Sequence, residues 1–263
     1  MTRGRVDWLA PDRRIDGVGA LMTTREGGVS RGPYASMNFG NAVGDAAADV
    51  AANRASLAAA VRAVPVFLRQ VHGARVVRVG AADGVPDAST HEADAAVTTE
   101  RGVACIVQAA DCLPVLIAAP GGRAVGAAHA GWRGLAGGVV ENTVAAVCAA
   151  AACAPEELVA WLGACIGPDA FEVGADVLAA FGVVDGGLAS AMPASASRFR
   201  AKGEGKWLAD LAGLTRDRLA AAGVARVDGG HWCTVSSPHR FFSYRRDGTT
   251  GRMAAAIWID AMR

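Results

Sequence analysis

Apolar and polar positions alternate in blocks along the chain, and the blocks have the lengths of strands and helices. Short apolar runs bounded by glycine, proline or charged residues predict buried strands at 17–24, 66–71, 75–79, 93–99, 104–110, 114–119, 124–128, 158–162 and 253–259. Apolar residues at helical intervals predict helices over 50–61, 135–151, 174–181 and 206–222. Residues 183–205 lack such a pattern and predict a surface loop. The alternation, without a low-complexity linker, favours a single α/β (α+β) domain over residues 1–263 with a mixed sheet and flanking helices.

Polar residues interrupt the most apolar part of this pattern. Asp111 and Cys112 stand between two apolar runs, His129 ends the next run, and His72 follows an earlier one. Each lies at the end of a predicted buried strand, where sites are commonly found in α/β domains. We therefore expect these side chains to lie at the same edge of the sheet.

Two imidazoles and a thiolate have the chemistry of a metal site. His72, Cys112 and His129 suit tetrahedral Zn(II), and three protein ligands leave a fourth position for water, as in a catalytic zinc site. Copper accepts the same ligands. The residue types alone leave other interpretations open. They favour a buried thiol at Cys112 beside a structural histidine over a metal site. A nucleophilic Cys112 with His129 as its base is a third interpretation.

Composition limits the classes of partner and location. Lys and Arg number 26 against 25 Asp and Glu, so the net charge is +1, which argues against a general nucleic-acid or membrane-surface binder. The N-terminal residues lack the apolar core of a signal peptide, and no apolar run is long enough to span a bilayer. Six cysteines without a C-x-x-C pair fit reduced thiols. The expected location is the cytoplasm.

Five ordered motifs carry a family resemblance. They are RQVHG at 69–73, ADCLP at 110–114, HAGWRG at 129–134, IGP at 166–168 with FEV at 171–173, and FSYRR at 242–246. The chain resembles, from about residue 23 to residue 259, the multicopper polyphenol oxidoreductase or laccase-domain proteins. That family has been reassigned as zinc-dependent purine nucleoside phosphorylases with adenosine deaminase activity.

The resemblance implies a fold, a metal and two reactions. The fold is a three-layer α/β arrangement, similar to a bacterial deamidating toxin that uses a Cys and His pair. His72, Cys112 and His129 match the metal ligands, with zinc expected and copper possible as the cofactor. The reactions are phosphorolysis of adenosine, inosine and methylthioadenosine to base and ribose 1-phosphate, and hydrolytic removal of the amino group of adenosine. Five histidines in all are too few for several copper centres.

Phosphorolysis requires groups that hold a phosphate. Arginine makes bidentate contacts to phosphate oxygens, so Arg133 beside His129 and Arg69 near His72 are the first candidates. Arg245 and Arg246 come after them. The alternative for each is a solvated or ion-paired surface arginine.

Deamination requires a carboxylate that moves a proton. The H-x-E pattern with P-C-x-x-C of cytidine-type deaminases is absent, so Asp111 is the nearest candidate for that shuttle; it is equally a candidate for fixing a ligand histidine. Trp132 either stacks on the purine or packs in the core. Gln70, inside the first motif, and Asn38, in a turn-rich loop, complete the predicted substrate-binding residues.

The predicted function is a zinc-dependent purine nucleoside phosphorylase and adenosine deaminase. Its partners are a purine nucleoside and phosphate, with no nucleic acid or membrane, and the protein is a monomer or homodimer. The alternatives are a cysteine-dependent amide hydrolase using Cys112 and His129, for example on cell-wall precursors, and a copper-dependent polyphenol oxidase. A metal-storing or scaffold protein is the non-enzymatic alternative.

Overall fold

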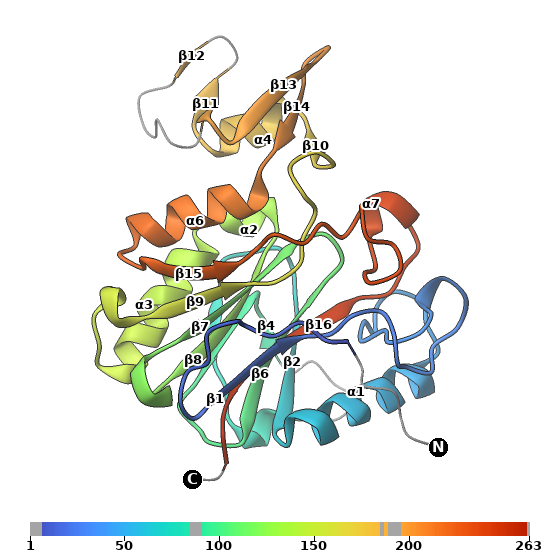
Figure 1. Cartoon of the computed structure of the whole chain (residues 1–263), viewed down its shortest axis with the longest axis vertical. Helices are drawn as coiled ribbons and strands as arrows, with labels where there is room; N and C mark the ends of the chain where they lie inside the picture. Colours follow the sequence, from blue (N-terminus) through green and yellow to red (C-terminus); the bar gives the residue numbers. More distant parts are fainter. Residues whose placement is uncertain (1–6, 85–90, 185–186, 189–195, 262–263) are drawn as a thin grey trace.

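Two mixed β-sheets lie face to face in the structure (Figure 1), a computed structural model that describes residues 7–84, 91–184, 187–188 and 196–261. The first sheet has the order β1-β16-β6-β2-β4, and the second has the order β15-β9-β7-β8-β5-β3. The strands of the first sheet are β1 (Val18–Met22), β2 (Val64–Arg69), β4 (His91–Glu92), β6 (Val103–Ala109) and β16 (Met253–Ile259). Those of the second are β3 (Val76–Arg78), β5 (Ala95–Thr98), β7 (Leu113–Ala118), β8 (Val125–Ala130), β9 (Val159–Leu162) and β15 (Arg226–Gly229).

Helices cover the outer face of each large sheet. Helix α1 (Ala47–Val61) packs on the first sheet, while α2 (Trp132–Ala136), α3 (Val139–Ala151) and α6 (Leu211–Ala221) pack on the second. A smaller region projects beyond the second sheet (Figure 1). It contains β10 (Glu172–Val173), α4 (Ala175–Ala180), β11 (Val183–Val184), β12 (Gly187–Leu188), β13 (Phe199–Gly203) and β14 (Lys206–Ala209). The short helix α7 (Tyr244–Asp247) precedes the last strand.

Strand β6 is buried on both faces and packs in two layers of the core at once. All its residues are buried, and successive side chains point to opposite faces of the sheet. Ile106 packs with α1, whereas Cys105 and Val107 pack in the core between the two sheets. A continuous apolar run is therefore required, since both faces of the strand are covered.

The predicted mixed α/β class is confirmed, but the arrangement has one more layer than expected. The strands divide between two sheets rather than forming one, which gives the order helix, sheet, sheet, helices. The apolar runs predicted the strands correctly, but their length and composition are the same in either sheet. The apolar runs therefore do not reveal which strand belongs to which sheet.

Three predicted segments differ from the structure. The helix predicted over 206–222 is strand β14 followed by α6, because the Asp210 side chain accepts a hydrogen bond from the N–H of Gly213 and begins the helix there. The helix predicted over 135–151 is divided into α2 and α3 at Gly138, whose φ is 91°. The loop predicted over 183–205 contains β13, which pairs with β14; residues 185–186 and 189–195 of that prediction lie outside the described residues.

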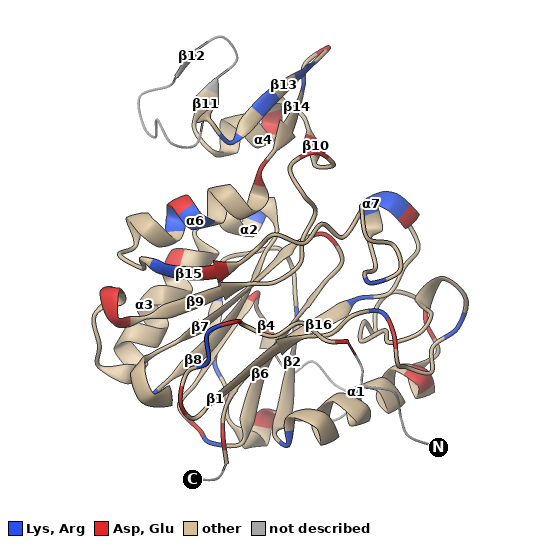
Figure 2. Cartoon of the chain, viewed as in Figure 1, with Lys and Arg blue, Asp and Glu red and all other residues tan. Residues whose placement is uncertain are grey.

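Charged residues lie mainly on loops, helices and the small projecting region, and both signs are interspersed (Figure 2). The strands of the two large sheets carry few of them. Among the described residues, no helix is both long enough and apolar enough to cross a membrane.

Candidate active site

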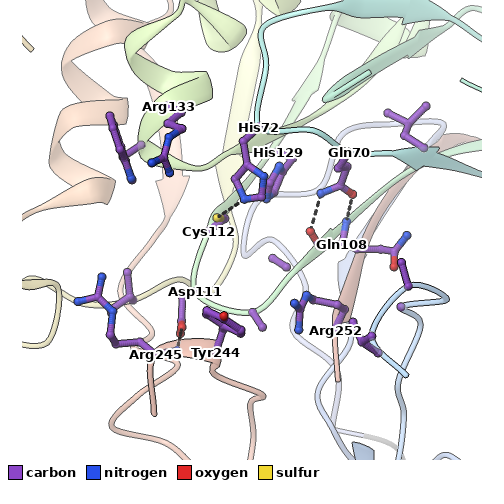
Figure 3. A pocket seen from close by; sticks show the side chains of 18 of the residues that line it. Gln70, His72, Gln108, Asp111, Cys112, His129, Arg133, Tyr244, Arg245 and Arg252 are labelled. Atoms are coloured by element: carbon purple, nitrogen blue, oxygen red, sulfur yellow. Dashed lines mark hydrogen bonds between the residues drawn. The ribbon is translucent and has the colours of Figure 1, made fainter. Parts of the chain in front are cut away.

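The three predicted metal ligands converge at one end of the paired sheets (Figure 3). The ligand atoms of His72, Cys112 and His129 all lie within 4.8 Å of one another. The Cys112 Sγ is 3.8 Å from Nε2 of His72, and the two imidazole rings meet edge to face with centroids 4.8 Å apart. Residues separated by tens of positions in the sequence are thus brought to one point. We call these three side chains the triad.

The triad forms where the chain crosses from one sheet to the other. Between β2 and β3 the crossing contains His72, and between β6 and β7 it contains Asp111 and Cys112. His72 and Asp111 have φ values of 62° and 92°, in the left-handed region that allows sharp turns. Gly131 follows β8, and a Cβ there would lie 2.9 Å from the Cys112 Sγ. Glycine therefore leaves the room that the thiol occupies.

A buried carboxylate that the sequence pattern does not single out supports the triad. Asp94, just before β5, accepts a hydrogen bond from Nδ1 of His129 at 2.9 Å. Its oxygens also accept the backbone N–H groups of Val71, His72 and Gly73. Asp94, and not Asp111, is therefore the carboxylate that is hydrogen-bonded to a histidine of the triad.

Cys112 and His129 change each other's protonation. Burial opposes a charge on the thiol, but the neighbouring His129 and His72 outweigh it and lower the pKa of Cys112 to about 6. Burial also opposes a charge on His129, but Cys112 and Asp94 outweigh it and raise the pKa of His129 to about 9. A thiolate beside an imidazolium is the resulting state near neutral pH.

This pairing predicts the pH dependence of thiol alkylation. In protein stripped of metal, we expect iodoacetamide to modify Cys112 at half its maximal rate near pH 6, where thiol and thiolate are equally populated. The rate falls below that pH as the thiolate is protonated; an ordinary thiol reaches half its rate at about pH 8.5. Mass spectrometry of the labelled peptide measures the rate, with Cys112→Ala as the blank. A half-maximal rate near pH 8.5 would contradict the ion pair.

A cavity of about 750 Å³ opens above the triad. Its wall includes the predicted residues Arg69, Gln70, Trp132 and Arg133. Asn38 is instead fully buried, and its amide binds the backbone of Gly40 and Arg252 and the side chain of Asp45. The prediction that Asn38 contacts substrate is not supported by this position, because its polar atoms already hold the adjoining loop.

The arginines of the wall differ in their partners. The Arg133 guanidinium lies over the Trp132 ring at 4.2 Å from its centroid, and no carboxylate among the described residues forms an ion pair with it. Arg69 forms an ion pair with Glu92. Of these two, Arg133 is the one whose charge remains available for an anion.

Helix α7 forms another part of the wall and is held by Asp111. The Asp111 Oδ2 accepts the backbone N–H of Arg245 at 2.6 Å, and its Oδ1 accepts the hydroxyl of Thr234. The side chain of Arg245 donates to the carbonyl of Glu172. Arg246 is bound to backbone carbonyls outside the cavity, which removes it from the phosphate candidates. Both oxygens of Asp111 thus accept hydrogen bonds within the protein. The structure does not test whether Asp111 also moves a proton, so the shuttle role stays a prediction.

Several residues of the cavity wall could not be predicted from the sequence. Arg252 lines the cavity, with Nη1 bound to the carbonyls of Thr250 and Gly251, and burial lowers its pKa. Figure 3 places Arg252 and Arg133 on opposite sides of the triad. Tyr244 and Phe171 add aromatic surface. Asp94 had a signal, an isolated charge within an alanine-rich strand segment, but Arg252 had none.

The donor set of the triad fits a divalent metal. Because Nδ1 of His129 is bound to Asp94, its Nε2 is the nitrogen left to face Cys112. Two imidazole nitrogens and a thiolate sulfur, with a carboxylate behind one histidine, are the arrangement found around zinc in proteins. Among the described residues this is the one group of three or more His, Cys, Asp or Glu side chains close enough to hold an ion.

Known proteins resemble this chain over almost its full length. Residues 19–260 match the model of a family described as multi-copper polyphenol oxidoreductase laccase. Purine nucleoside phosphorylase YfiH of Escherichia coli strain K12 is 47% identical over 245 residues, which cover 92% of this chain and 94% of that protein. Purine nucleoside phosphorylase YlmD of Geobacillus stearothermophilus is 38% identical, with 92% and 90% covered.

Solved structures share the fold. The crystal structure of Neisseria meningitidis protein NMB0706 superposes with a TM-score of 0.87 at 46% identity, covering 97% of this chain and all of that one. YlmD from Geobacillus stearothermophilus gives a TM-score of 0.89 at 34% identity, covering 99% and 98%. The two stacked sheets are therefore shared with experimentally determined relatives.

Proposed function

The chain belongs to the family described as multi-copper polyphenol oxidoreductase laccase, and we propose that within it the protein is a zinc-dependent purine nucleoside phosphorylase that also deaminates adenosine. Adenosine, inosine and methylthioadenosine are the proposed nucleosides. The observation that carries the proposal is the triad, set in a cavity of about 750 Å³ with arginine and aromatic side chains on its wall. The relatives named purine nucleoside phosphorylase supply the reaction class.

His72, Cys112 and His129 would hold the zinc ion. When bound, zinc supplies Lewis-acid polarisation of an oxygen and charge stabilisation in the transition state. Asp94 keeps His129 oriented, and the half-buried Cys112 supplies a negative charge that offsets part of the ion's charge.

The residues of the wall bind and orient the two substrates. Arg133 has a guanidinium with no ion-pair partner among the described residues, so it binds phosphate by charge-assisted hydrogen bonds. The guanidinium of Arg252 lies on the other side of the triad and adds a second positive charge to the same cavity. Tyr244 is mostly exposed and lines the cavity. Arg252 lies over one face of its ring, and the purine would stack on the other face. Phosphate and nucleoside are thereby held next to each other over the triad.

Product analysis tests this proposal. Zinc-loaded protein is incubated with adenosine, with and without inorganic phosphate, and the products are separated by chromatography. We expect adenine and ribose 1-phosphate only when phosphate is present. Inosine should form in both cases, and with phosphate part of it should go on to hypoxanthine and ribose 1-phosphate. Chelation should stop both reactions, and added zinc should restore them. Adenosine left unchanged by the zinc-loaded protein would contradict the proposal.

Arg133→Gln separates the two reactions. A hydrogen bond to a charged group contributes about 1.5 to 3 kcal/mol, so we expect phosphorolysis to lose roughly 10- to 150-fold in kcat/KM for phosphate. Deamination uses no phosphate and should lose much less. Steady-state kinetics with both assays measure the ratio, with Arg123→Gln, a partly exposed arginine outside the cavity wall, as the matched control. An equal loss in both reactions would contradict the phosphate role.

A cysteine-dependent amide hydrolase is the second candidate, because Cys112, His129 and Asp94 follow one another as thiol, imidazole and carboxylate. That order is found in cysteine hydrolases with a base and an orienting group. Amide cleavage that survives chelation and stops on alkylation of Cys112 would favour this candidate. Copper-dependent polyphenol oxidation would instead require that copper, and not zinc, restore activity to the stripped protein.

A further inference from the structure

One carboxylate contacts both histidines of the triad. Oδ1 of Asp94 accepts from Nδ1 of His129 and from the backbone N–H of His72, each at 2.9 Å. Oδ2 accepts the backbone N–H of Val71 at 3.1 Å and of Gly73 at 2.7 Å. The Asp94 side chain has no exposed surface, so these four donors take the place of water around its charge.

The contact with His129 selects a ring nitrogen. A carboxylate accepts hydrogen bonds only, so the proton of a neutral His129 must lie on Nδ1. Nε2 then carries the lone pair. The backbone N–H of His129 also donates to the carbonyl oxygen of Asp94 at 2.7 Å, which limits movement of one residue relative to the other. His129 is therefore presented with Nε2 toward Cys112.

The contact with the turn at 71–73 fixes the other histidine. His72 has φ of 62°, a conformation that costs a non-glycine residue about 1 to 3 kcal/mol unless its surroundings enforce it. Three successive N–H groups directed at one carboxylate provide that enforcement. In the described part of the chain, the His72 ring makes no hydrogen bond except with Cys112. Its position therefore depends on the turn.

We infer that Asp94 is the positioning residue of the triad, which sets Nε2 of His129 toward the metal and holds the turn that presents His72. The inference rests on the proposed metal site and deepens it, because one side chain then controls both nitrogen ligands. Asp94 does not position Cys112, because Cys112 lies on the crossing between β6 and β7.

Asp94→Asn is nearly isosteric and conflicts with this network in either orientation. With its NH₂ group at the Oδ1 position, it faces Nδ1 of His129 and drives the ring proton to Nε2, where a metal must bind. With its NH₂ group at the Oδ2 position, it faces the N–H groups of Val71 and Gly73, and the turn loosens. Both orientations weaken a nitrogen ligand.

Zinc affinity measures this effect without an activity assay. Competition with a chromophoric chelator should show Asp94→Asn binding zinc about 10- to 100-fold more weakly than wild type, the usual effect of losing a partner of a metal ligand. Asp83→Asn is the matched control, because Asp83 pairs with His91 at 2.9 Å outside the cavity wall, and its affinity should equal that of wild type. Wild-type affinity in Asp94→Asn would overturn the inference and leave the metal site standing. A wild-type protein that binds zinc no more tightly than Cys112→Ala would overturn both.

Two further measurements separate positioning from a general effect on folding. In the His129→Ala background, whose weak residual zinc binding is measured by titration with excess zinc, Asp94→Asn should cost less zinc affinity than it does in wild type, since its action through the ring is already lost. An equal cost would overturn that action. If Asp94→Asn does not fold, the crystal structure of zinc-bound wild type decides. His129 bound to zinc through Nε2 and to Asp94 through Nδ1 supports the inference, whereas zinc on Nδ1 overturns it.

Discussion

Cys112→Ala is expected to abolish zinc retention and to lower turnover of adenosine by more than about 100-fold. Loss of a partner behind a ligand costs up to about 100-fold in affinity or activity, and loss of the ligand itself should cost more. His129→Ala should have the same effect, because its ring and the thiolate stabilise each other's charge. Elemental analysis after gel filtration and the two adenosine assays measure the outcome.

The loss can be attributed to the site only if the variants fold as the wild type does. Cys153→Ala serves as the control, because this half-buried thiol follows α3, outside the cavity wall. It should retain both metal and activity. Circular dichroism of all variants should match wild type. A Cys112→Ala protein that retained both zinc and turnover would remove the triad from the mechanism.

Phe242→Ala is expected to lower the free energy of unfolding by about 3 to 5 kcal/mol, the usual cost of deleting a fully buried aromatic ring. The ring has no exposed surface and packs in the core between the two sheets. The Arg25 guanidinium lies over it, 4.7 Å from the ring centroid. Ser243, which caps α7, follows directly, so the cavity left by the ring should also loosen that helix. Urea denaturation followed by fluorescence measures the change.

Tyr244→Ala is the matched control for Phe242→Ala. It removes the ring of a neighbouring residue that is 61% exposed, and substitutions of exposed residues usually change stability by less than about 0.5 kcal/mol. Equal destabilisation by the two variants would show that the core between the sheets does not depend on Phe242. Activity is not the measure here, because Tyr244 lines the cavity.

The apolar pattern was sufficient to predict elements whose residues are apolar throughout. Strand β16 has the predicted bounds of Met253–Ile259, since seven apolar residues leave little choice. The region after residue 205 was not predictable in the same way, because Trp207 and Leu208 fit the helical spacing of α6 equally well. Asp210 determines the outcome there by capping the helix. Such a cap acts through one hydrogen bond, which apolar spacing does not reveal.

The site was predictable where its chemistry is unusual for a core. A thiol and two imidazoles at the ends of apolar strands indicated the triad, and the structure brings all three together. The sequence does not single out Asp94, because a lone aspartate between alanines resembles a strand end. Arg252 was passed over because arginine before a strand is common. Their importance comes from partners distant in the sequence, and no local pattern identifies those partners.

The two crossings of the chain give the triad a mechanical consequence. His72 lies on the passage that leaves the first sheet, and His129 lies on a strand of the second. An ion bound by both residues would link the two sheets. The free energy of metal binding would then also stabilise the packing of one sheet against the other. At a free ion concentration 1,000 times the dissociation constant, that contribution is about 4 kcal/mol. The reaction centre would then set the molecule's resistance to heat as well as its chemistry.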